Sequence, residues 1–401
     1  MMKNKELNEV KVCMFVFNNM VSDSRVLKEA NSLSKFGAKV EILALWDKGL
    51  KRKNYVDGVI INRVNIMTRR LPKIIPLRSL IVFIEVFLRF LIFGFISNAD
   101  VYHSHDASPL PVVYLLSVIK KSHFVYDSHE LEIARAKTIN NKIQKIRIMF
   151  EKVFMPKADK MIISDGDARA HVMLEYHGVE RSYQVIRNYP LNSGNIENND
   201  MILHNILSIS HSTDILLYIG HTHPGRGLEE VIYALEKLPE NIVFVVLGKK
   251  YPSFVNSLQS LAASLGVNDR LFFLPPVDPG EVVDYAAGAK LSFVLIQNIG
   301  LSYYLSTPSK LFESIAAGVP VIASDFPEIR KIVLSNGIGP TGIVVDPSDV
   351  SEIVRSTQDI LNNHDMWEDF HMNSLRLAEN EIKWELEEEK LINLYIDMLY
   401  E

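Results

Sequence analysis

A lysine and a glutamate lie three residues apart within the stretch STPSKLFESIAAGVPVIASD, residues 306–325. Thr307 can cap a helix and Pro308 suits its first position, so Lys310 and Glu313 fall near the helix start. A helix N-terminus attracts phosphate through its unpaired N–H groups and positive dipole end, and Lys310 adds a full positive charge. Glu313 could accept hydrogen bonds from ribose hydroxyls. The stretch therefore predicts a nucleotide phosphate site, although a solvated i, i+3 ion pair would be the simpler interpretation.

Other polar side chains follow apolar runs in the first half of the chain. They are Asn18 and Asn19 after VCMFVF, His105 and Asp106 at the end of DVYHSHD, and His129 at the end of FVYDSH. In parallel sheets, ligands bind beyond the carboxyl ends of the strands. These residues are therefore candidates for a cleft. Two alternatives stay open: a capping histidine bonded to backbone, and asparagines that only form a turn.

Metal-binding patterns are weak in this sequence. Asp165 and Asp167 have the form Asp-x-Asp, but they follow an apolar run and open a helical pattern, which favours helix capping. His103 and His105 share one face of a predicted strand, yet no third ligand has an obvious spacing. We therefore expect no bound metal.

Apolar runs alternate with helical patterns twice along the chain. VEILAL, FVYDSH and KMIISD belong to the first half, and ILLYIG, IVFVVLG, LSFVLI and GIVVD follow residue 200. Such alternation predicts parallel sheets covered on both faces. We expect an α/β protein of two doubly wound, Rossmann-like domains facing across a cleft: residues 1–190, completed by a C-terminal helix at 381–401, and residues 205–380. A linker is expected near residues 189–205, which contain the polar stretch LNSGNIENND.

The charge of the 401-residue chain is divided unevenly. Residues 1–190 hold 30 basic and 19 acidic residues (+11), whereas the remainder holds 13 and 29 (−16). The first half is therefore expected to face an anionic partner. One cysteine, Cys13, excludes a disulfide framework, and the polar N-terminus has no apolar signal-peptide core. Both features favour a cytoplasmic protein.

The stretch PSKLFESIAAGVPVIASDFPE resembles the nucleotide-sugar-binding motif of GT-B-fold glycosyltransferases, particularly the retaining enzymes of glycosyltransferase family 4. DSRVLKEANSLSKFGAKVEILAL is similar to the first helix and second strand of that family, DVYHSHD and FVYDSHE to its cleft-facing strand ends, and YIGHTHPGRGLEEVIYAL to its first phosphate loop. WELEEEKLINLY resembles the closing helix that returns to the N-terminal domain. The lack of Gly-x-Gly-x-x-Gly after the first strand argues against a dinucleotide enzyme.

The resemblance implies a transferase that uses a nucleoside-diphosphate sugar, UDP-sugar foremost, with retention of configuration. Arg226 and Lys310 would neutralise the diphosphate as the glycosidic bond breaks, so no metal or other cofactor is expected. Glu313 matches the glutamate that holds the ribose, and His129 matches a cleft histidine near the transferred sugar. The implied donor-binding residues are Gly220, Arg226, Ser309, Lys310, Leu311 and Glu313. The implied acceptor-side residues are Asn18, Asn19, His105 and Asp106, and the implied catalytic residues are His129, Arg226 and Lys310.

One position departs from the family pattern. Many members have two glutamates eight positions apart, the first of which touches sugar hydroxyls, and the corresponding place here is Leu305. The surrounding QNIGLSYYLSTPSK also lacks the usual glycine-rich turn. Two alternatives to a transferase therefore stay open: a nucleotide-sugar epimerase of the same fold, and a degenerate protein that binds nucleotide without transferring sugar.

Residues 74–96 are mostly apolar but are interrupted by Pro76, Arg78, Glu85 and Arg89. The roughly 17 residues that remain are short for a bilayer span, so burial against the sheet and contact with a membrane surface are both open. Basic residues lie nearby in TRRLPK and in the amphipathic pattern at 135–157: Arg69, Arg70, Lys73, Lys137, Lys142, Lys145 and Lys152. This combination favours an anionic membrane surface over nucleic acid. We expect a peripheral protein at the cytoplasmic face of the membrane, with a lipid-linked or glycan acceptor in surface polysaccharide or glycoconjugate synthesis.

Overall fold

The computed structural model describes residues 7–400 except 22, 73, 76, 135–140, 192–200 and 335–336. The chain forms two compact units. Unit 1 comprises Met1–Arg187 with Glu387–Glu401, and unit 2 comprises Asn188–Leu386. Each unit is built around one β-sheet. Most of the expected linker lies outside the described residues.

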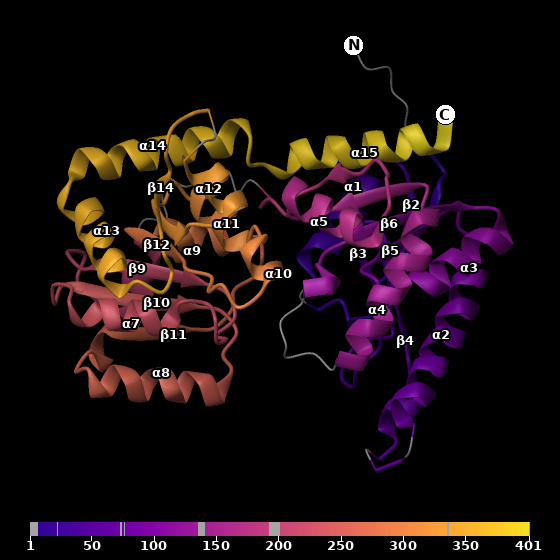
Figure 1. Ribbon diagram of the computed structural model, residues 1–401, viewed down its shortest axis with the longest axis horizontal. Helices are drawn as coiled ribbons and strands as arrows, with labels where there is room; N and C mark the ends of the chain where they lie inside the picture. Colours follow the sequence, from indigo (N-terminus) through magenta and orange to yellow (C-terminus); the bar gives the residue numbers. More distant parts are fainter. Residues whose placement is uncertain are drawn as a thin grey trace. The chain divides into compact units, whose positions relative to one another are not determined.

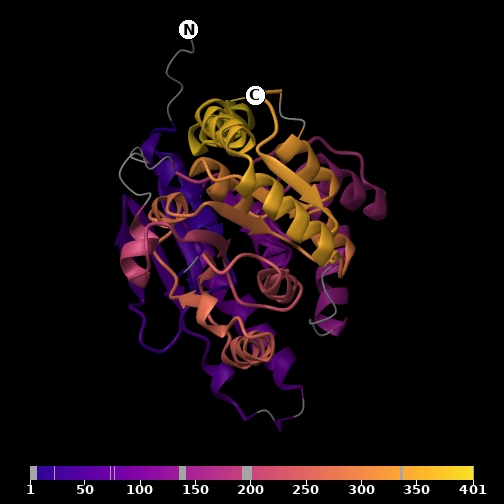
Figure 2. The same ribbon diagram turned by 90° about the vertical axis from the view of Figure 1, so that its left-hand side faces the viewer.

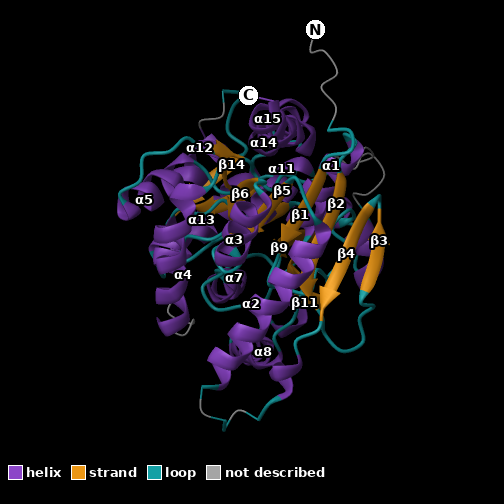
Figure 3. Ribbon diagram, turned by 90° about the vertical axis from the view of Figure 1, so that its right-hand side faces the viewer, coloured by secondary structure: helices purple, strands orange, loops and turns teal. Residues whose placement is uncertain are grey.

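Unit 1 contains an eight-stranded, mostly parallel sheet. Its strands are β1 (Lys11–Phe15), β2 (Lys39–Leu45), β3 (Lys53–Val56), β4 (Val59–Val64), β5 (Val101–His105), β6 (His123–Ser128), β7 (Lys160–Ile163) and β8 (Gln184–Val185). Their order is β3-β4-β2-β1-β5-β6-β7-β8. The β3–β4 pair is antiparallel and the other neighbours are parallel. Figure 3 shows β1, β2, β4 and β3 following one another toward the edge of the sheet that β3 forms.

Helices connect the parallel strands of unit 1, because a parallel pair needs a crossover. The α-helices are α1 (Ser24–Lys35), α2 (Arg78–Ser97), α3 (Leu110–Lys120), α4 (Asn141–Phe154) and α5 (Asp167–His177), and the 3₁₀ helices are η1 (Met67–Arg70), η2 (Glu132–Ala134) and η3 (Met155–Lys157). Gly94 lets α2 approach the sheet closely, since an added Cβ would lie 2.4 Å from Leu116 Cδ1 and 2.7 Å from Phe15 Cζ. Any larger residue there would push α2 away from β1 and α3.

The C-terminal helix α15 (Trp384–Tyr400) belongs to unit 1 from Glu387 onward. The Tyr395 hydroxyl is buried and lies 2.8 Å from Nδ1 of His103 on β5. Glu387 accepts a hydrogen bond of 2.7 Å from the backbone N–H of Arg187. Figure 1 shows α15 in yellow beside α1 and α5. The last helix of the chain therefore completes the core of the first unit.

Unit 2 contains a six-stranded, wholly parallel sheet. Its strands are β9 (Asp214–Ile219), β10 (Ile242–Leu247), β11 (Leu271–Leu274), β12 (Leu291–Val294), β13 (Val321–Ser324) and β14 (Gly342–Val345), in the order β11-β10-β9-β12-β13-β14. Alternate residues of β9 enter different cores, with Leu216 and Tyr218 in one and Ile215 and Leu217 in the other. Both faces of the sheet are therefore covered.

Helices of different lengths enclose the sheet of unit 2. They are α6 (Ile202–Leu207), α7 (Leu228–Glu236), α8 (Pro252–Ser264), η5 (Asn268–Arg270), α9 (Val282–Ala287), α10 (Leu301–Tyr304), α11 (Ser309–Ala316), α12 (Pro327–Leu334), α13 (Val350–Asn362) and α14 (His364–Asn380). Helix α13 contacts β13 and β14, and Figure 2 shows the yellow helices of this unit beside its orange strands. Two parallel-sheet α/β units confirm the predicted fold class.

Candidate functional site

The helix that carries Lys310 begins one residue later than the sequence predicts. Ser309 is the first helical residue of α11, and Pro308 is its N-cap with extended backbone (φ −71°, ψ 142°). The N-cap is therefore Pro308 and not Thr307, and the Pro308 side chain makes no capping hydrogen bond. Lys310 remains in the first turn, where the N–H groups are unpaired within the helix.

Lys310 is buried at this helix start, with 8% of the residue exposed. Its Nζ lies 3.6 Å from the ring centroid of Tyr218, at the end of β9. Gly220 (φ +128°) follows β9, and its backbone passes so close that an added Cβ would lie 3.5 Å from Nζ. Burial, and next the charge of Arg226, lower the pKa of Lys310 well below its usual value, against the opposing effect of Glu313. A bound anion would instead favour the charged ammonium.

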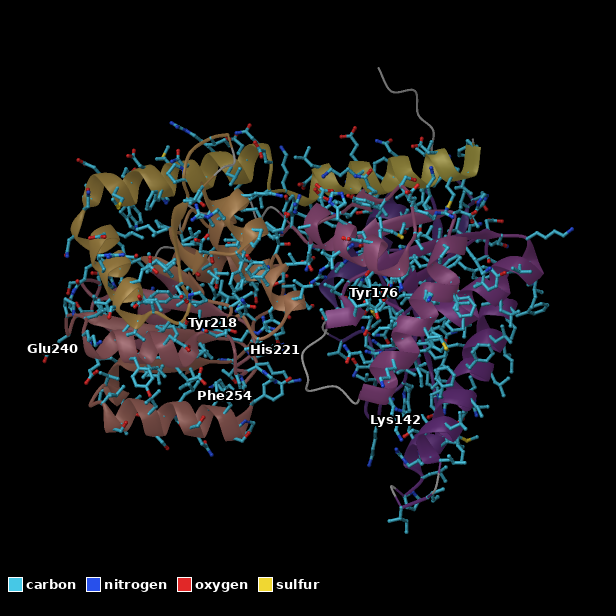
Figure 4. All side chains as sticks on the ribbon, viewed as in Figure 1. Lys142, Tyr176, Tyr218, His221, Glu240 and Phe254 are labelled. Atoms are coloured by element: carbon cyan, nitrogen blue, oxygen red, sulfur yellow. The ribbon has the colours of Figure 1, made fainter. Side chains whose placement is uncertain are left out.

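Arg226 places a second cation in the loop between β9 and α7. Its guanidinium carbon lies 4.9 Å from the ring centroid of Tyr303. His221 belongs to the same loop and, as Figure 4 shows, lies near the labelled Tyr218. Burial, followed by the charges of Lys249, Arg226 and Lys310, lowers the pKa of His221. Lys249, Arg226 and Lys310 therefore gather at the loop that follows the carboxyl end of β9. In their charged forms they would stabilise a diphosphate.

The other predicted donor-binding residues on α11, and Leu305, differ in burial and in hydrogen bonding. Ser309 Oγ accepts a hydrogen bond of 3.1 Å from Asn188 Nδ2, and Leu311 is fully buried. Glu313 is half-buried on the next turn of α11. Leu305 ends α10 and is 6% exposed. Its apolar side chain cannot hydrogen-bond to a sugar, so this position provides no hydroxyl contact.

Unit 1 holds a cavity of about 190 Å³ beyond the ends of β1, β5 and β6. Its polar lining consists of Asn18, Asp23, His105, Asp106, Ser108, His129 and Arg147. Four of the predicted cleft residues are therefore brought together. Asn19 does not line the cavity: its Nδ2 donates to Asp47 Oδ2 at 2.9 Å, and its Oδ1 accepts from the N–H of Val21. Asn18 makes the same kind of turn, because its Oδ1 accepts from the N–H of Met20 at 2.8 Å, but it also lines the cavity.

A buried network centred on Asp127 lies next to this cavity. Asp127 Oδ2 accepts hydrogen bonds from His129 Nε2 at 2.7 Å and His105 Nδ1 at 3.2 Å. Arg25 of α1 donates through Nη2 to Oδ1 at 3.0 Å and through Nε to Oδ2 at 3.3 Å. Glu29, one turn further along α1, pairs with the same guanidinium at 3.0 Å. Of the side chains in this network, that of His129 has the largest exposed fraction, 17%.

The charges in this network depend on one another. Burial would raise the pKa of Asp127, but Arg25 and His129 hold it well below its usual range. Burial alone would lower the pKa of His129, but the carboxylates of Asp127 and Asp106 outweigh it and raise the pKa to about 10. Burial and then Asp127 raise the pKa of Glu29 to about 8. At neutral pH an ionised Asp127 therefore faces a guanidinium and an imidazolium.

Sequence reasoning missed Arg25, Glu29 and Asp127. One usable feature was the spacing in FVYDSH, because Asp127 and His129 are two residues apart and lie on the same side of an extended chain. Another was the i, i+4 spacing of Arg25 and Glu29, which puts both charges on one face of α1. Neither feature says by itself that the two pairs meet.

Three side chains of the network and the neighbouring His103, which stacks on His105, have a spacing that could hold a metal ion. Ligand atoms of Glu29, His103, His105 and Asp127 all lie within 4.8 Å of one another. However, Arg25 already pairs with both carboxylates and supplies positive charge between them. A divalent cation would have to displace or repel that guanidinium, so we interpret the cluster as an arginine-centred network.

The Asp-x-Asp pattern at 165–167 serves the start of α5. Asp165 pairs with Arg169 one turn along the helix, and Asp167 accepts a hydrogen bond of 3.1 Å from the Tyr183 hydroxyl. The prediction that an aspartate caps this helix is wrong, because Gly166 (φ +143°) is the N-cap. Glycine permits this backbone conformation, and Asp167 then occupies the first helical position.

Comparison with known proteins begins with the second unit. Residues 201–376 match the family Glycosyl transferases group 1. A D-inositol 3-phosphate glycosyltransferase from Xylanimonas cellulosilytica is 30% identical over 145 residues, covering 36% of this chain and 33% of that protein. A protein of the same name from Mycobacterium sp. (strain JLS) is 22% identical over 269 residues, covering 66% and 59%. The chain thus spans about one third to three fifths of the length of these relatives.

Solved structures resemble the chain over nearly its whole length. Sucrose-phosphate synthase from Thermosynechococcus elongatus has a TM-score of 0.80 at 16% identity, covering 97% of this chain and 99% of that chain. HepE from Anabaena, in complex with UDP-glucose, has a TM-score of 0.75 at 14% identity, covering 97% and 100%. WaaG, a glycosyltransferase involved in lipopolysaccharide biosynthesis, has a TM-score of 0.69 at 16% identity, covering 96% and 99%. Residues 201–376 therefore match the model of the family Glycosyl transferases group 1, and the chain as a whole has the fold of these GT-B glycosyltransferase structures.

Proposed function

We propose that this chain is a glycosyltransferase that moves a sugar from a nucleoside-diphosphate sugar, UDP-sugar foremost, to an acceptor with retention of configuration. The observation that carries the proposal is the pair of cations Arg226 and Lys310, which lie over Tyr303 and Tyr218 at 4.9 and 3.6 Å. A leaving diphosphate would gain charge-assisted contacts there as the glycosidic bond breaks. The transferase names of the relatives and the UDP-glucose complex of HepE support the same donor class.

Thermal unfolding with a panel of UDP-, ADP- and GDP-sugars tests the donor assignment. At least one nucleotide sugar is expected to raise the unfolding temperature, because a ligand that binds the folded state stabilises it. The matching nucleoside, which lacks the diphosphate, is expected to have little effect. If every nucleotide sugar leaves the unfolding temperature unchanged, or if the nucleoside alone stabilises equally, the diphosphate site is wrongly assigned.

Sugar transfer is expected to continue in excess EDTA. Arg226, Lys310 in the charged form that a bound anion favours, and the N-terminus of α11 together balance a diphosphate. The measurement is the initial rate of nucleoside-diphosphate release with and without EDTA, and then with added Mg²⁺ or Mn²⁺. Loss of activity in EDTA that either metal restores would show that the reaction needs a divalent cation.

Helix α2 has two apolar stripes with different surroundings. Val86, Phe90 and Gly94 are its buried residues, and Phe90 lies 6.3 Å from the ring of Phe15 on β1. The opposite stripe is 47–71% exposed and comprises Leu80, Ile84, Leu88, Ile92 and Ile96. Burial against the sheet, one of the two interpretations of residues 74–96, therefore describes the stripe of Val86, Phe90 and Gly94 but not the opposite stripe. By length and composition α2 could cross a membrane, but its attachment to the sheet favours lying at the membrane surface instead.

Helix α4 extends the apolar surface and adds charge to it. Phe150 of α4 stacks on Phe83 of α2 at 6.0 Å, so the two helices adjoin. The exposed side chains of α4 include Ile143, Ile146, Met149 and Val153 alternating with Lys142, Lys145 and Lys152. Figures 1 and 3 show the N-terminal end of α2 extending beyond the sheet of unit 1, and Figure 4 labels Lys142 on α4. Lys73 and Lys137 lie outside the described residues.

We further propose that this surface docks on an anionic lipid bilayer and that the acceptor is lipid-linked or otherwise membrane-borne. Exposed apolar side chains beside lysines are the combination that binds the interface of an anionic membrane. Charge complementarity supports a bilayer rather than a second copy of the chain, because two like-charged lysine faces would repel each other. The protein would then act as a peripheral enzyme at the cytoplasmic face, in the synthesis of surface polysaccharide or glycoconjugate.

Replacing Lys142, Lys145 and Lys152 by glutamate is expected to release the protein from phosphatidylglycerol vesicles. Each basic group near an anionic leaflet contributes about 1 kcal/mol, so reversing three should weaken binding by at least about a hundredfold. Vesicle sedimentation measures the bound fraction, and rising salt should lower it for the unmodified protein.

The matched control replaces the same three lysines by arginine, which keeps the charge and should keep vesicle binding. Nucleotide binding should survive in both triple variants, since Lys310 and Arg226 belong to unit 2. Equal vesicle binding by the glutamate and arginine variants, or no binding of the unmodified protein to anionic lipid, would contradict membrane docking.

The buried Leu305 gives some support to a second candidate, a nucleotide-sugar-binding protein that transfers nothing. Its side chain is 6% exposed and offers no hydrogen bond to a sugar. Such a protein would bind a nucleotide sugar without releasing the nucleoside diphosphate. An epimerase would instead interconvert nucleotide sugars with no acceptor present, so product analysis separates all three.

A further inference from the structure

We propose that Asp127 is a positioning residue that holds His129 as an imidazolium ion, so that His129 is a fixed hydrogen-bond donor in the cavity of unit 1 and not a base. The inference rests on the proposed function in one respect, that the cavity receives a reacting sugar or an acceptor. The ionisation of His129 itself can be tested without any activity.

The carboxylate of Asp127 is fixed from both sides. It is fully buried on β6, and the guanidinium of Arg25 holds its two oxygens at 3.0 and 3.3 Å. Arg25 is fixed in turn, because its Nη1 donates to the carbonyl oxygen of Ile186 at 2.8 Å, just beyond β8. With Arg25 anchored at three points, the carboxylate cannot rotate away from His129 without breaking buried hydrogen bonds. The network therefore presents a pre-oriented anion to the histidine.

His129 is oriented by contacts to its ring and its backbone. Its Nε2 lies 2.7 Å from Asp127 Oδ2. Its backbone N–H donates to Asp106 Oδ1 at 3.1 Å, and its carbonyl oxygen accepts from Arg169 Nη1 at 2.7 Å. Within the described part of the chain no hydrogen bond to Nδ1 is recorded, and the residue lines the cavity. An Nδ1–H group would therefore be available to a molecule that enters there.

The charges around His129 favour its protonated form. Acidic groups near it are Asp127, Asp106, Asp23 and Glu29, and basic groups near it are Arg25, Arg147, Arg169, His105 and His103. Burial lowers the pKa of His105, so this neighbour is neutral at pH 7 and does not repel the imidazolium. The carboxylates outweigh burial and the arginines, which raises the pKa of His129 to about 10.

The direction of the His129 pKa shift determines the pH range in which the His129–Asp127 pair stabilises the fold. The folded-state pKa of His129, about 10, is above the unfolded value of about 6.5. The stabilisation by Asp127 is therefore fully present below about pH 6.5 and is lost as the pH rises through about 10. Around neutral pH the ion pair is intact.

A permanent imidazolium limits what His129 can do chemically. A general base must be deprotonated at the working pH, and His129 with a proton on both ring nitrogens cannot accept another. It can donate from Nδ1 to an oxygen of a bound sugar or acceptor, and its positive charge would favour negative charge that develops on that oxygen. Asp127 would act only through His129, by keeping the proton on Nε2.

Nuclear magnetic resonance of nitrogen-15-labelled histidine tests the proposal directly on the full chain. The His129 signals are assigned by their loss in His129→Gln and are followed from pH 5 to 10.5. We expect an imidazolium throughout the neutral range, with titration beginning above about pH 9. In Asp127→Asn the midpoint should fall by at least about two pH units. Titration of His129 near pH 6.5 in the unmodified protein would overturn the proposal, even if Asp127→Asn did not fold.

The pH dependence of turnover tests the consequence for the reaction. The donor is the nucleotide sugar found by thermal unfolding, and the acceptor probe is vesicles of total lipid extract from the source organism. Between pH 6 and pH 8.5, the activity of Asp127→Asn should fall at least about fourfold more than that of the unmodified protein, because its His129 loses the proton within this range. The matched control is Asp159→Asn, which alters an exposed Asp–His pair of 3.8 Å at the other end of β6.

The control should keep the pH profile of the unmodified protein. Parallel profiles for Asp127→Asn and the unmodified protein would overturn the positioning role, because a merely structural aspartate would change the amount of folded protein and not the shape of the profile. If no nucleotide sugar is consumed by any variant, the proposed function fails, while the resonance titration still decides the state of His129.

Discussion

Lys310→Ala and Arg226→Ala are each expected to weaken UDP binding by roughly ten- to a hundredfold and to remove nearly all sugar transfer. A lost charge-assisted hydrogen bond costs roughly 1.5–3 kcal/mol, and about 1.4 kcal/mol corresponds to tenfold in affinity. The loss in transfer should exceed the loss in binding, because the diphosphate gains charge only as the bond breaks. Isothermal titration calorimetry with UDP and the rate of UDP release measure the two effects.

The matched control for these variants is Lys237→Ala, an exposed lysine at the end of α7 in the same unit. It should bind UDP as the unmodified protein does. Lys310→Ala should also fold, because burial of its ammonium is unfavourable until an anion arrives. Unchanged UDP affinity in both active-site variants would remove the donor site from this end of the sheet.

Arg25→Ala is expected to lower the free energy of unfolding of unit 1 by about 3–5 kcal/mol. Removing the arginine takes away the buried guanidinium that pairs with Asp127 and Glu29, and breaking a buried ion pair on one side is strongly destabilising. For a unit of about two hundred residues, this corresponds to a fall in unfolding temperature on the order of 10 °C. Differential scanning calorimetry measures the shift.

The control lies on the same helix. Lys35 pairs with Glu388 at 2.8 Å, and the lysine side chain is 66% exposed. Because exposed ion pairs contribute about 0–1 kcal/mol, Lys35→Ala should change the unfolding temperature little. An equal loss of stability in Lys35→Ala and Arg25→Ala would show that the buried network is not what stabilises unit 1.

The sheets could be predicted because their strands are continuous apolar runs. FVYDSH covers all of β6 except His123, and PVIASD contains β13; strands covered on both faces have this composition. The cavity residues His105 and His129 could be predicted from the sequence for the same reason. His105 ends β5, and His129 follows β6, the neighbour of β5, so both lie at one edge of the sheet. The apolar runs, and the rule that ligands bind beyond the carboxyl ends of parallel strands, were enough to predict these two residues.

The network beneath the cavity could not be predicted in the same way. Arg25 and Asp127 are 102 residues apart, and their contact depends on the tertiary packing that brings the first turn of α1 to β6. Helix α2 shows a second limit. Apolar residues four apart on both stripes would suit a fully buried helix equally well, and only the packing of Gly94 and Phe90 shows which stripe meets the sheet. At α11 the local rule placed the helix start one residue too early, because Pro308 has an extended backbone and is itself the N-cap.

The most direct test of the central claim is a product analysis with UDP-, ADP- and GDP-sugars and vesicles of total lipid extract. We expect one donor to yield its nucleoside diphosphate and a glycosylated lipid in equal amounts, detected by mass spectrometry, and expect neither product from Lys310→Ala. Interconversion of nucleotide sugars without lipid would indicate an epimerase. Tight binding of a nucleotide sugar with no release of nucleoside diphosphate, with or without lipid, would contradict the assignment of this chain as a glycosyltransferase.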